Sequence, residues 1–110
     1  MIPRFSLVRP ATLAEAFDAY AAAAGDAAYI AGGTELLQVM KMGFAQIGTL
    51  IDLKRLPELR GISVNGQVRI GAATTHREIE RSPELGAALP GLVALERRVA
   101  NVRVRNTGTI

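Results

Sequence analysis

Three short apolar segments, separated by two segments with helical spacing, set the plan of the first half of the chain. The apolar segments are residues 4–8, 27–31 and 49–53, each of a length typical of a strand. Thr12 and Glu15 have the spacing of a helix capping box. Because strands that alternate with helices pair in parallel across the crossover, the first half predicts a β-α-β-α-β unit.

The residue pattern within these segments predicts which side chains are buried. The first helix should present an apolar stripe to the sheet, made of Leu13, Phe17, Tyr20 and Ala24 with Ala16 beside them. Thr34 should cap the second helix, and Gly43 should end or interrupt it. Its buried side is predicted to carry Leu36, Leu37, Met40 and Phe44. The segment 27–31 has no charged residue, which predicts a strand buried on both faces.

Local pairing replaces this alternation in the second half of the chain. Asn65-Gly66 is typical of a type I′ hairpin turn, and apolar residues alternate around it at Ile62, Val64, Val68 and Ile70. The change predicts two subdomains, residues 1–54 and 55–110. The fold class is then α+β, with a small β-α-β-α-β subdomain before the start of a mixed or antiparallel sheet.

Capping patterns predict short helices after the hairpin. Thr75 and Glu78 form a second capping box, and Ser82 followed by Pro83 marks another helix start. A longer helix over residues 90–100 should bury the side that carries Leu92, Leu95 and Val99.

The last ten residues, 101–110, contain valines that alternate with arginines. This alternation predicts a strand or extended segment with Arg103 and Arg105 on one face.

Missing residue types exclude several kinds of site. The 110 residues include no cysteine, so disulfides, thiolate metal sites and cysteine-bound iron–sulfur clusters are excluded. The single histidine, His76, is expected on the exposed first turn of a helix, and neither a metal site nor a catalytic acid–base group is predicted. No apolar run reaches the roughly 18 residues of a membrane helix. The N-terminus has no signal-peptide pattern, so a cytoplasmic protein without membrane insertion is expected.

Gly32 and Gly33 stand between an apolar strand and a helix start. One interpretation is an ordinary turn. The other is an anion-binding loop, because glycines let a phosphate approach the backbone and the first amides of a helix lack acceptors. The stretch has neither the lysine of a P-loop nor the third glycine of a dinucleotide fingerprint, so by itself it favours the ordinary turn.

Two further stretches favour a ligand. The end of a predicted strand carries four small residues, Gly71, Ala72, Ala73 and Thr74, which would suit either a flat ligand or tight packing. Near the end of the chain, Thr107 and Thr109 flank Gly108, which suits a turn that contacts phosphate.

Together, five stretches resemble the FAD-binding medium subunit of the molybdenum hydroxylases, the family of xanthine dehydrogenase and aerobic carbon monoxide dehydrogenase. In chain order they read FSLVRPATLAEAF, AGGTELL, LIDLKRLPELRGI, IGAATTHREIE and VRNTGTI. The resemblance implies a two-part FAD-binding fold of the vanillyl-alcohol oxidase type. In that fold FAD lies between a small α/β subdomain and a larger one with an antiparallel sheet.

The resemblance also implies site residues. The first glycine loop would bind the FAD pyrophosphate with Ile30, Ala31, Gly32, Gly33, Thr34, Glu35 and Leu36. Ala72 would make room for the flavin. The family's second pyrophosphate motif reads T-I-G-G-N, of which Thr109 and Ile110 are present, preceded by Gly108. The sequence is therefore expected to be an N-terminal fragment cut within a binding motif, with poor FAD binding and no activity of its own.

Cofactors and partners follow from the same resemblance. In the family, a large subunit with a molybdenum cofactor hydroxylates the substrate, and a small subunit with two [2Fe–2S] clusters passes electrons to FAD. FAD then reduces NAD⁺, a quinone or another acceptor. Two alternatives stay open: a stand-alone FAD oxidoreductase of the same fold and, less favoured, a nucleic-acid-binding domain that uses the arginines from Arg97 to Arg105. A net charge of +3, three Phe and two Tyr argue against nucleic acid.

Overall fold

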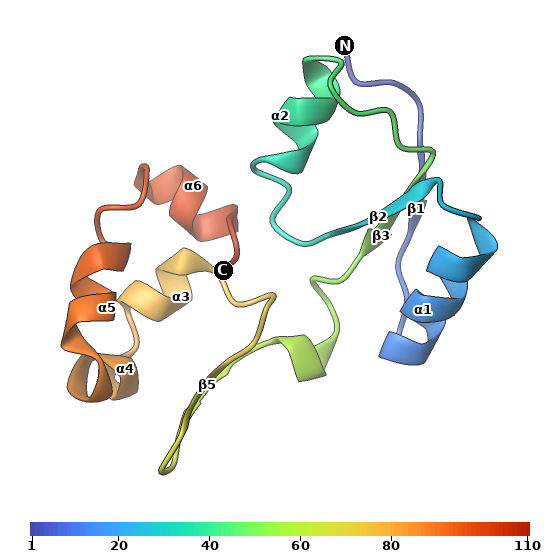
Figure 1. The fold of residues 1–110 in the computed structure, drawn as a ribbon. Coiled ribbons are helices and arrows are strands. Elements are labelled where there is room, and N and C mark those ends of the chain that lie inside the picture. The colour runs from blue at the N-terminus through green and yellow to red at the C-terminus, as the bar shows by residue number, and fades with distance from the viewer. The chain divides into compact units, whose positions relative to one another are not determined.

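The computed structural model describes residues 1–110 and contains two units, Met1–Leu56 and Pro57–Ile110 (Figure 1). The first unit alternates strands and helices, as the sequence predicts. Its elements are β1 (Ser6–Val8), α1 (Leu13–Ala22), β2 (Ala27–Ile30), α2 (Leu36–Lys41) and β3 (Thr49–Asp52). The strands form one parallel sheet in the order β1-β3-β2. In Figure 1, α1 and α2 lie on opposite sides of this sheet.

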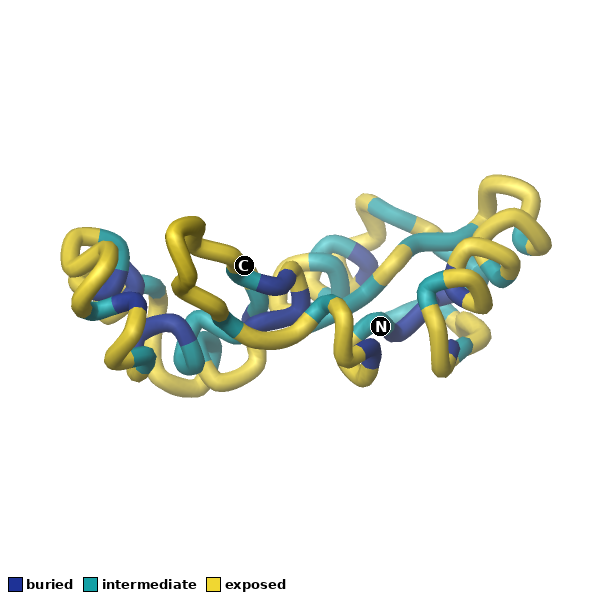
Figure 2. Tube along the Cα trace, turned by 90° about the horizontal axis from the view of Figure 1, so that it is seen from below, coloured by how far each residue is buried: buried dark blue, intermediate teal, exposed yellow.

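The central position of β3 decides what is buried in the first unit. Leu50 and Ile51 of β3 are buried, because a neighbouring strand flanks them on each side. The prediction that residues 27–31 are buried on both faces is wrong: β2 is an edge strand, and its Tyr29 is 38% exposed. In the tube of Figure 2, buried segments are short and are separated by longer exposed stretches.

Helix α1 begins at the predicted cap. The Thr12 hydroxyl accepts a hydrogen bond from the Glu15 amide at 3.1 Å, while the Glu15 carboxylate accepts from the Ala11 amide at 2.7 Å. The predicted apolar stripe is covered only in part, since Ala16 is fully buried but Phe17 is 58% exposed. A sheet of three short strands is too narrow to cover the whole stripe.

Helix α2 begins later than the sequence suggests. Its N-cap is Glu35, and no side chain caps it, so the prediction of Thr34 as the cap is wrong. The turn that follows the glycines includes both residues, which moves the first helical residue to Leu36.

The C-terminal end of α2 lies where Gly43 predicts it. Gly43 has a φ of +81°, its amide donates to the Met40 carbonyl, and the next amide, of Phe44, donates to the Val39 carbonyl. These two bonds form a Schellman motif. Met40 is fully buried as predicted, but Phe44 lies beyond the helix end and is 80% exposed, which contradicts its predicted burial.

The second unit opens with a 3₁₀ turn, η1 (Pro57–Leu59), and a hairpin of β4 (Ile62–Val64) and β5 (Val68–Ile70). Val64 pairs with Val68, so a three-residue loop joins the strands. Only Gly66 in this loop has a positive φ, +80°. The predicted type I′ turn is therefore wrong, because that turn requires two consecutive residues with positive φ.

Four helices follow the hairpin: α3 (His76–Glu80), α4 (Pro83–Ala88), α5 (Pro90–Glu96) and α6 (Val102–Thr107). The predicted capping box of Thr75 and Glu78 is complete, and Ser82 caps α4 by accepting from the Leu85 amide at 3.2 Å. None of the helices in either unit has the length and apolar character required to cross a membrane.

The core of the second unit joins the helices to the hairpin. Ile79, Leu85 and Val93 are buried, and partly buried residues pack against them: Ile62, Ile70 and Leu92. The predicted buried face of residues 90–100 is wrong in part, because Leu95 is 64% exposed. Helix α5 ends at Glu96 and is too short to follow the spacing on which that prediction depended.

The chain end is helical rather than extended. The Asn101 side chain accepts from the amides of Arg103 and Val104, at 3.0 and 3.2 Å, and so caps α6. The strand or extended segment predicted for residues 101–110 is therefore wrong over Val102–Thr107. A capping side chain satisfies the first amides of a helix, and this local bond overrides the alternating pattern.

Candidate functional site

The glycine loop leaves the sheet at the carboxyl ends of its strands. Because all three strands are parallel, Val8 of β1, Ile30 of β2 and Asp52 of β3 end at the same edge. The Ile30 carbonyl accepts from the Leu53 amide at 2.8 Å, which ties the start of the loop to the central strand. In open parallel sheets, ligands bind outside this edge.

The loop between β2 and α2 presents backbone amides that have no acceptor. The Gly33 and Glu35 carbonyls accept from the amides of Leu37 and Val39, at 3.1 and 3.0 Å, and so begin the helical pattern. No backbone hydrogen bond starts from the amides of residues 32–36. Adjacent unpaired amides can bind an external anion. Since α2 has only six residues, the amides themselves, rather than a helix dipole, supply the attraction.

Gly33 is required by the backbone of the loop itself. Its φ is +72°, a region that side chains other than glycine rarely adopt. A Cβ at this position would lie 3.1 Å from Ile30 Cδ1 and 3.2 Å from Leu37 Cδ1. The two interpretations of the sequence, a turn and an anion-binding loop, are therefore compatible at this residue.

Charged residues lie at the same edge of the sheet. Asp52 is only 5% exposed, and its Oδ1 accepts from the Lys54 amide at 2.9 Å. Its Oδ2 lies 3.8 Å from Arg9 Nε and 3.9 Å from Lys54 Nζ. The sequence pattern does not predict this trio, although Arg9 and Lys54 each follow a predicted strand and Asp52 lies within one. Arg9 and Lys54 thus place two cationic side chains beside this carboxylate at the edge where the loop begins.

The small residues at the end of β5 have mixed roles. A Cβ on Gly71 would lie 2.3 Å from the Leu59 carbonyl oxygen, so backbone packing alone requires glycine there. Ala73 and Thr74 are buried, and the Thr74 hydroxyl accepts from the Gly61 amide at 3.0 Å. Ala72 alone of the four predicted residues is exposed and open to contact from outside.

The chain end lies beside this strand end. Thr109 forms an antiparallel bridge with Thr75, the Ile110 amide donates to the Thr74 carbonyl at 3.1 Å, and the His76 amide donates to the Gly108 carbonyl at 3.0 Å. The structure thus brings two of the three predicted stretches together within the second unit. The predicted residues from Ile30 to Leu36 belong to the first unit.

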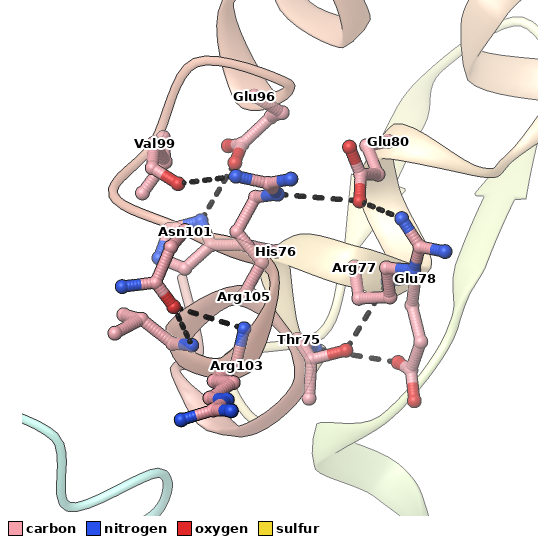
Figure 3. Close-up of polar contacts among 11 residues, drawn as sticks. Thr75, His76, Arg77, Glu78, Glu80, Glu96, Val99, Asn101, Arg103 and Arg105 are labelled. Atoms are coloured by element: carbon pink, nitrogen blue, oxygen red, sulfur yellow. Dashed lines mark hydrogen bonds and ion pairs between the residues drawn. The ribbon is translucent and has the colours of Figure 1, made fainter.

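A polar network holds the helices that carry this chain end (Figure 3). His76 Nδ1 lies 2.6 Å from Glu96 Oε2, and both side chains are largely buried. The prediction of His76 as an exposed surface residue is therefore wrong, because α5 packs against α3 and supplies a carboxylate partner.

Glu80 is the second centre of this network. Its Oε1 accepts from Arg77 at 2.5 Å and from Arg105 Nε at 3.3 Å, and Arg105 also donates to the Val99 carbonyl at 2.8 Å. The hydrogen bond from Arg77, aided by Arg105, lowers the pKa of Glu80 despite its burial. The network therefore joins α3 to α6, next to the residues that lead into Gly108.

Comparison with known proteins identifies the family. Residues 3–110 match the model of the FAD binding domain in molybdopterin dehydrogenase. The chain is 43% identical over 109 residues to the carbon monoxide dehydrogenase medium chain of Hydrogenophaga pseudoflava, and 36% identical over 110 residues to the nicotine 6-hydroxylase medium subunit of Paenarthrobacter nicotinovorans. These matches cover 98% and 99% of this chain and 38% of each relative.

Comparison with solved structures indicates the same family. Carbon monoxide dehydrogenase from Hydrogenophaga pseudoflava superposes with a TM-score of 0.95 at 42% identity, over 99% of this chain and 38% of that one. The chain belongs to the family of FAD-binding domains of molybdopterin dehydrogenases. The α+β, two-part FAD-binding fold and the family resemblance predicted from the sequence are confirmed. The chain spans less than two fifths of the length of the relatives it matches.

Proposed function

We propose that this chain binds FAD with two groups of residues, one in each unit. The first group is the glycine loop from Ile30 to Leu36, which holds the diphosphate. The second comprises Ala72 beside the flavin and Gly108, Thr109 and Ile110 at a second phosphate contact. The protein is then the flavin-carrying subunit of a molybdenum hydroxylase. It receives electrons from an iron–sulfur subunit and passes them to an acceptor such as NAD⁺ or a quinone.

The run of amides without acceptors carries this proposal. A diphosphate has several anionic oxygens, and hydrogen bonds to charged acceptors are stronger than those between neutral groups. The loop offers such donors at the sheet edge where Arg9 and Lys54 add positive charge. Glu35 is exposed, so its carboxylate is free to turn toward solvent and away from the phosphates.

The residues of this chain bind and orient the cofactor. When bound, FAD supplies the hydride and electron transfer, which no side chain in the chain performs. The loop amides fix the diphosphate, the tie between Ile30 and Leu53 fixes the loop, and Ala72 leaves room for a flat ring.

Paired glycine substitutions test the loop assignment. Gly33→Ala and Gly43→Ala each place a Cβ at positive φ, which costs about 1–2 kcal/mol of stability. Only Gly33→Ala disturbs the backbone that carries the loop amides. The affinity of this variant for FAD should therefore fall about tenfold, which is the effect of losing one charge-assisted hydrogen bond.

The measurement is the flavin absorbance per polypeptide and the Kd for FAD, with the protein expressed from its complete gene. Gly43→Ala is the matched control, since a Cβ there meets nothing within 4 Å. If the two variants retain flavin equally, the loop does not hold the diphosphate.

A further inference from the structure

A polar groove on the second unit lies outside the proposed FAD residues. Residues of α3, α4 and α5 and of their connecting segment line it, and its volume is about 410 Å³. Its lining includes the side chains of Arg77, Glu80, Arg81, Ser82, Val93 and Arg97. We name it the arginine groove.

The arginines of this groove differ in what they bind. Arg77 is committed to Glu80, as Figure 3 shows, and the lowered pKa of Glu80 keeps that carboxylate charged. Arg81 and Arg97 are exposed, and neither guanidinium has an ion-pair partner in the structure. The groove therefore keeps two uncompensated positive charges.

The lining of the groove indicates what kind of anion it takes. Small-molecule sites are mostly apolar and enclose their ligand, whereas Val93 and Pro83 are the main apolar residues here. Arginine is enriched where proteins meet, because its planar fork pairs with a carboxylate through two hydrogen bonds. The two exposed guanidinium groups on this polar surface are therefore better suited to carboxylates on another protein than to a small enclosed ligand.

We infer that the arginine groove is a docking site for an acidic segment of a partner subunit, whose carboxylates pair with Arg81 and Arg97. This inference rests on the proposed function, since it takes the chain to be one subunit of a larger enzyme. Arg77 is excluded from the pairing because Glu80 already holds it, and Ser82 remains a hydroxyl donor for a third contact.

Charge reversal tests the groove. The complex is purified after co-expression with the genes of its partner subunits, and Arg81→Glu/Arg97→Glu is compared with Arg103→Glu. Arg103 is an exposed arginine of the same unit that does not line the groove. Assembly affinity should fall about tenfold or more in the double variant at low salt, as expected for losing two exposed ion pairs and gaining repulsion. The loss should shrink at high salt.

Flavin content is measured in the same preparations, and it should stay at the wild-type level in all variants. Arg81→Gln/Arg97→Gln, which removes charge without reversing it, should give a smaller loss of assembly. A photo-crosslinker at position 97 should join to a partner peptide that carries aspartates or glutamates.

If the complex that carries Arg81→Glu/Arg97→Glu assembles with the affinity of the wild type, the inference is wrong. It is also wrong if the double variant assembles normally but loses affinity for inorganic phosphate, because the groove would then be a small-anion site. The charge reversal could weaken assembly while the wild-type complex contains no flavin. That result would contradict the proposed function but would still support the docking site.

Discussion

Glu80 is a nearly buried carboxylate that accepts hydrogen bonds from two helices. Arg77 lies on its own helix α3, and Arg105 lies on α6, 25 residues further along the chain. The Arg77 hydrogen bond is the main reason why the pKa of Glu80 lies below its ordinary value, with burial opposing it. Arg77 is three residues before Glu80 on the same helix, a spacing that the sequence shows. Arg105 could not be assigned from the sequence, because the contact of α6 with α3 depends on the fold of the whole unit.

The lowered pKa of Glu80 predicts an acid-sensitive contribution to stability. A carboxylate with a depressed folded-state pKa stabilises the folded protein above its unfolded value, and the contribution is lost as the pH falls through the folded value. The free energy of unfolding of Glu80→Gln should therefore lie below that of the wild type at pH 7, and the difference should shrink toward pH 3.

Urea unfolding between pH 3 and pH 7 measures this difference. Glu84→Gln is the control, since Glu84 is exposed and takes part in no ion pair of the structure. A constant difference between wild type and Glu80→Gln at every pH would contradict the assignment.

Caps decide where the helices begin, and they show which elements a sequence can predict. The caps at Thr12 and Ser82 and the capping box at Thr75 depend on residues three positions apart, so the local sequence is enough, although Glu15 bonds the amide of Ala11 and not that of Thr12, which leaves the predicted box there incomplete. The burial of β2 could not be predicted in this way, because the strand order puts β3 in the centre. The period-2 pattern of residues 101–105 predicts an extended segment, whereas helix α6 forms because the Asn101 side chain caps its first amides.

Removal of the Asn101 cap should destabilise the second unit by about 1 kcal/mol, the usual cost of losing an asparagine N-cap. Two amides, of Arg103 and Val104, lose their acceptor in Asn101→Ala. Asn106→Ala, in the same helix and exposed, is the matched control and should change stability by less than about 0.5 kcal/mol. Equal losses in chemical denaturation would show that the cap does not stabilise α6.

At the scale of the whole molecule, too, the candidate site combines residues that local sequence motifs predict with residues that only the fold brings together. The glycine loop, Ala72 and the chain end are predicted site residues that rest on local motifs and a family resemblance. The trio of Arg9, Asp52 and Lys54 could not, because it exists only once three parallel strands end at one edge. The pairing of Thr75 with Thr109 likewise joins residues that are distant in sequence.

Each unit has its own sheet and its own buried residues, and the chain carries a separate natural reporter in each. Tyr20 and Tyr29, the only tyrosines, stack in the first unit with ring centroids 5.0 Å apart. His76, the only histidine, lies in the second unit. Tyrosine circular dichroism and the NMR signal of the His76 ring therefore report on different halves of the molecule.

Core truncations should separate these two signals in the protein without cofactor. Leu50→Ala removes a buried side chain of β3, and Ile79→Ala removes one from the core of the second unit, each at a cost of about 2–5 kcal/mol. Because stability is set by contacts within each cooperative unit, Leu50→Ala should lower the denaturation midpoint of the tyrosine signal and leave that of His76 unchanged. Ile79→Ala should do the reverse, and a joint shift of both midpoints in either variant would mean that the two units unfold as one.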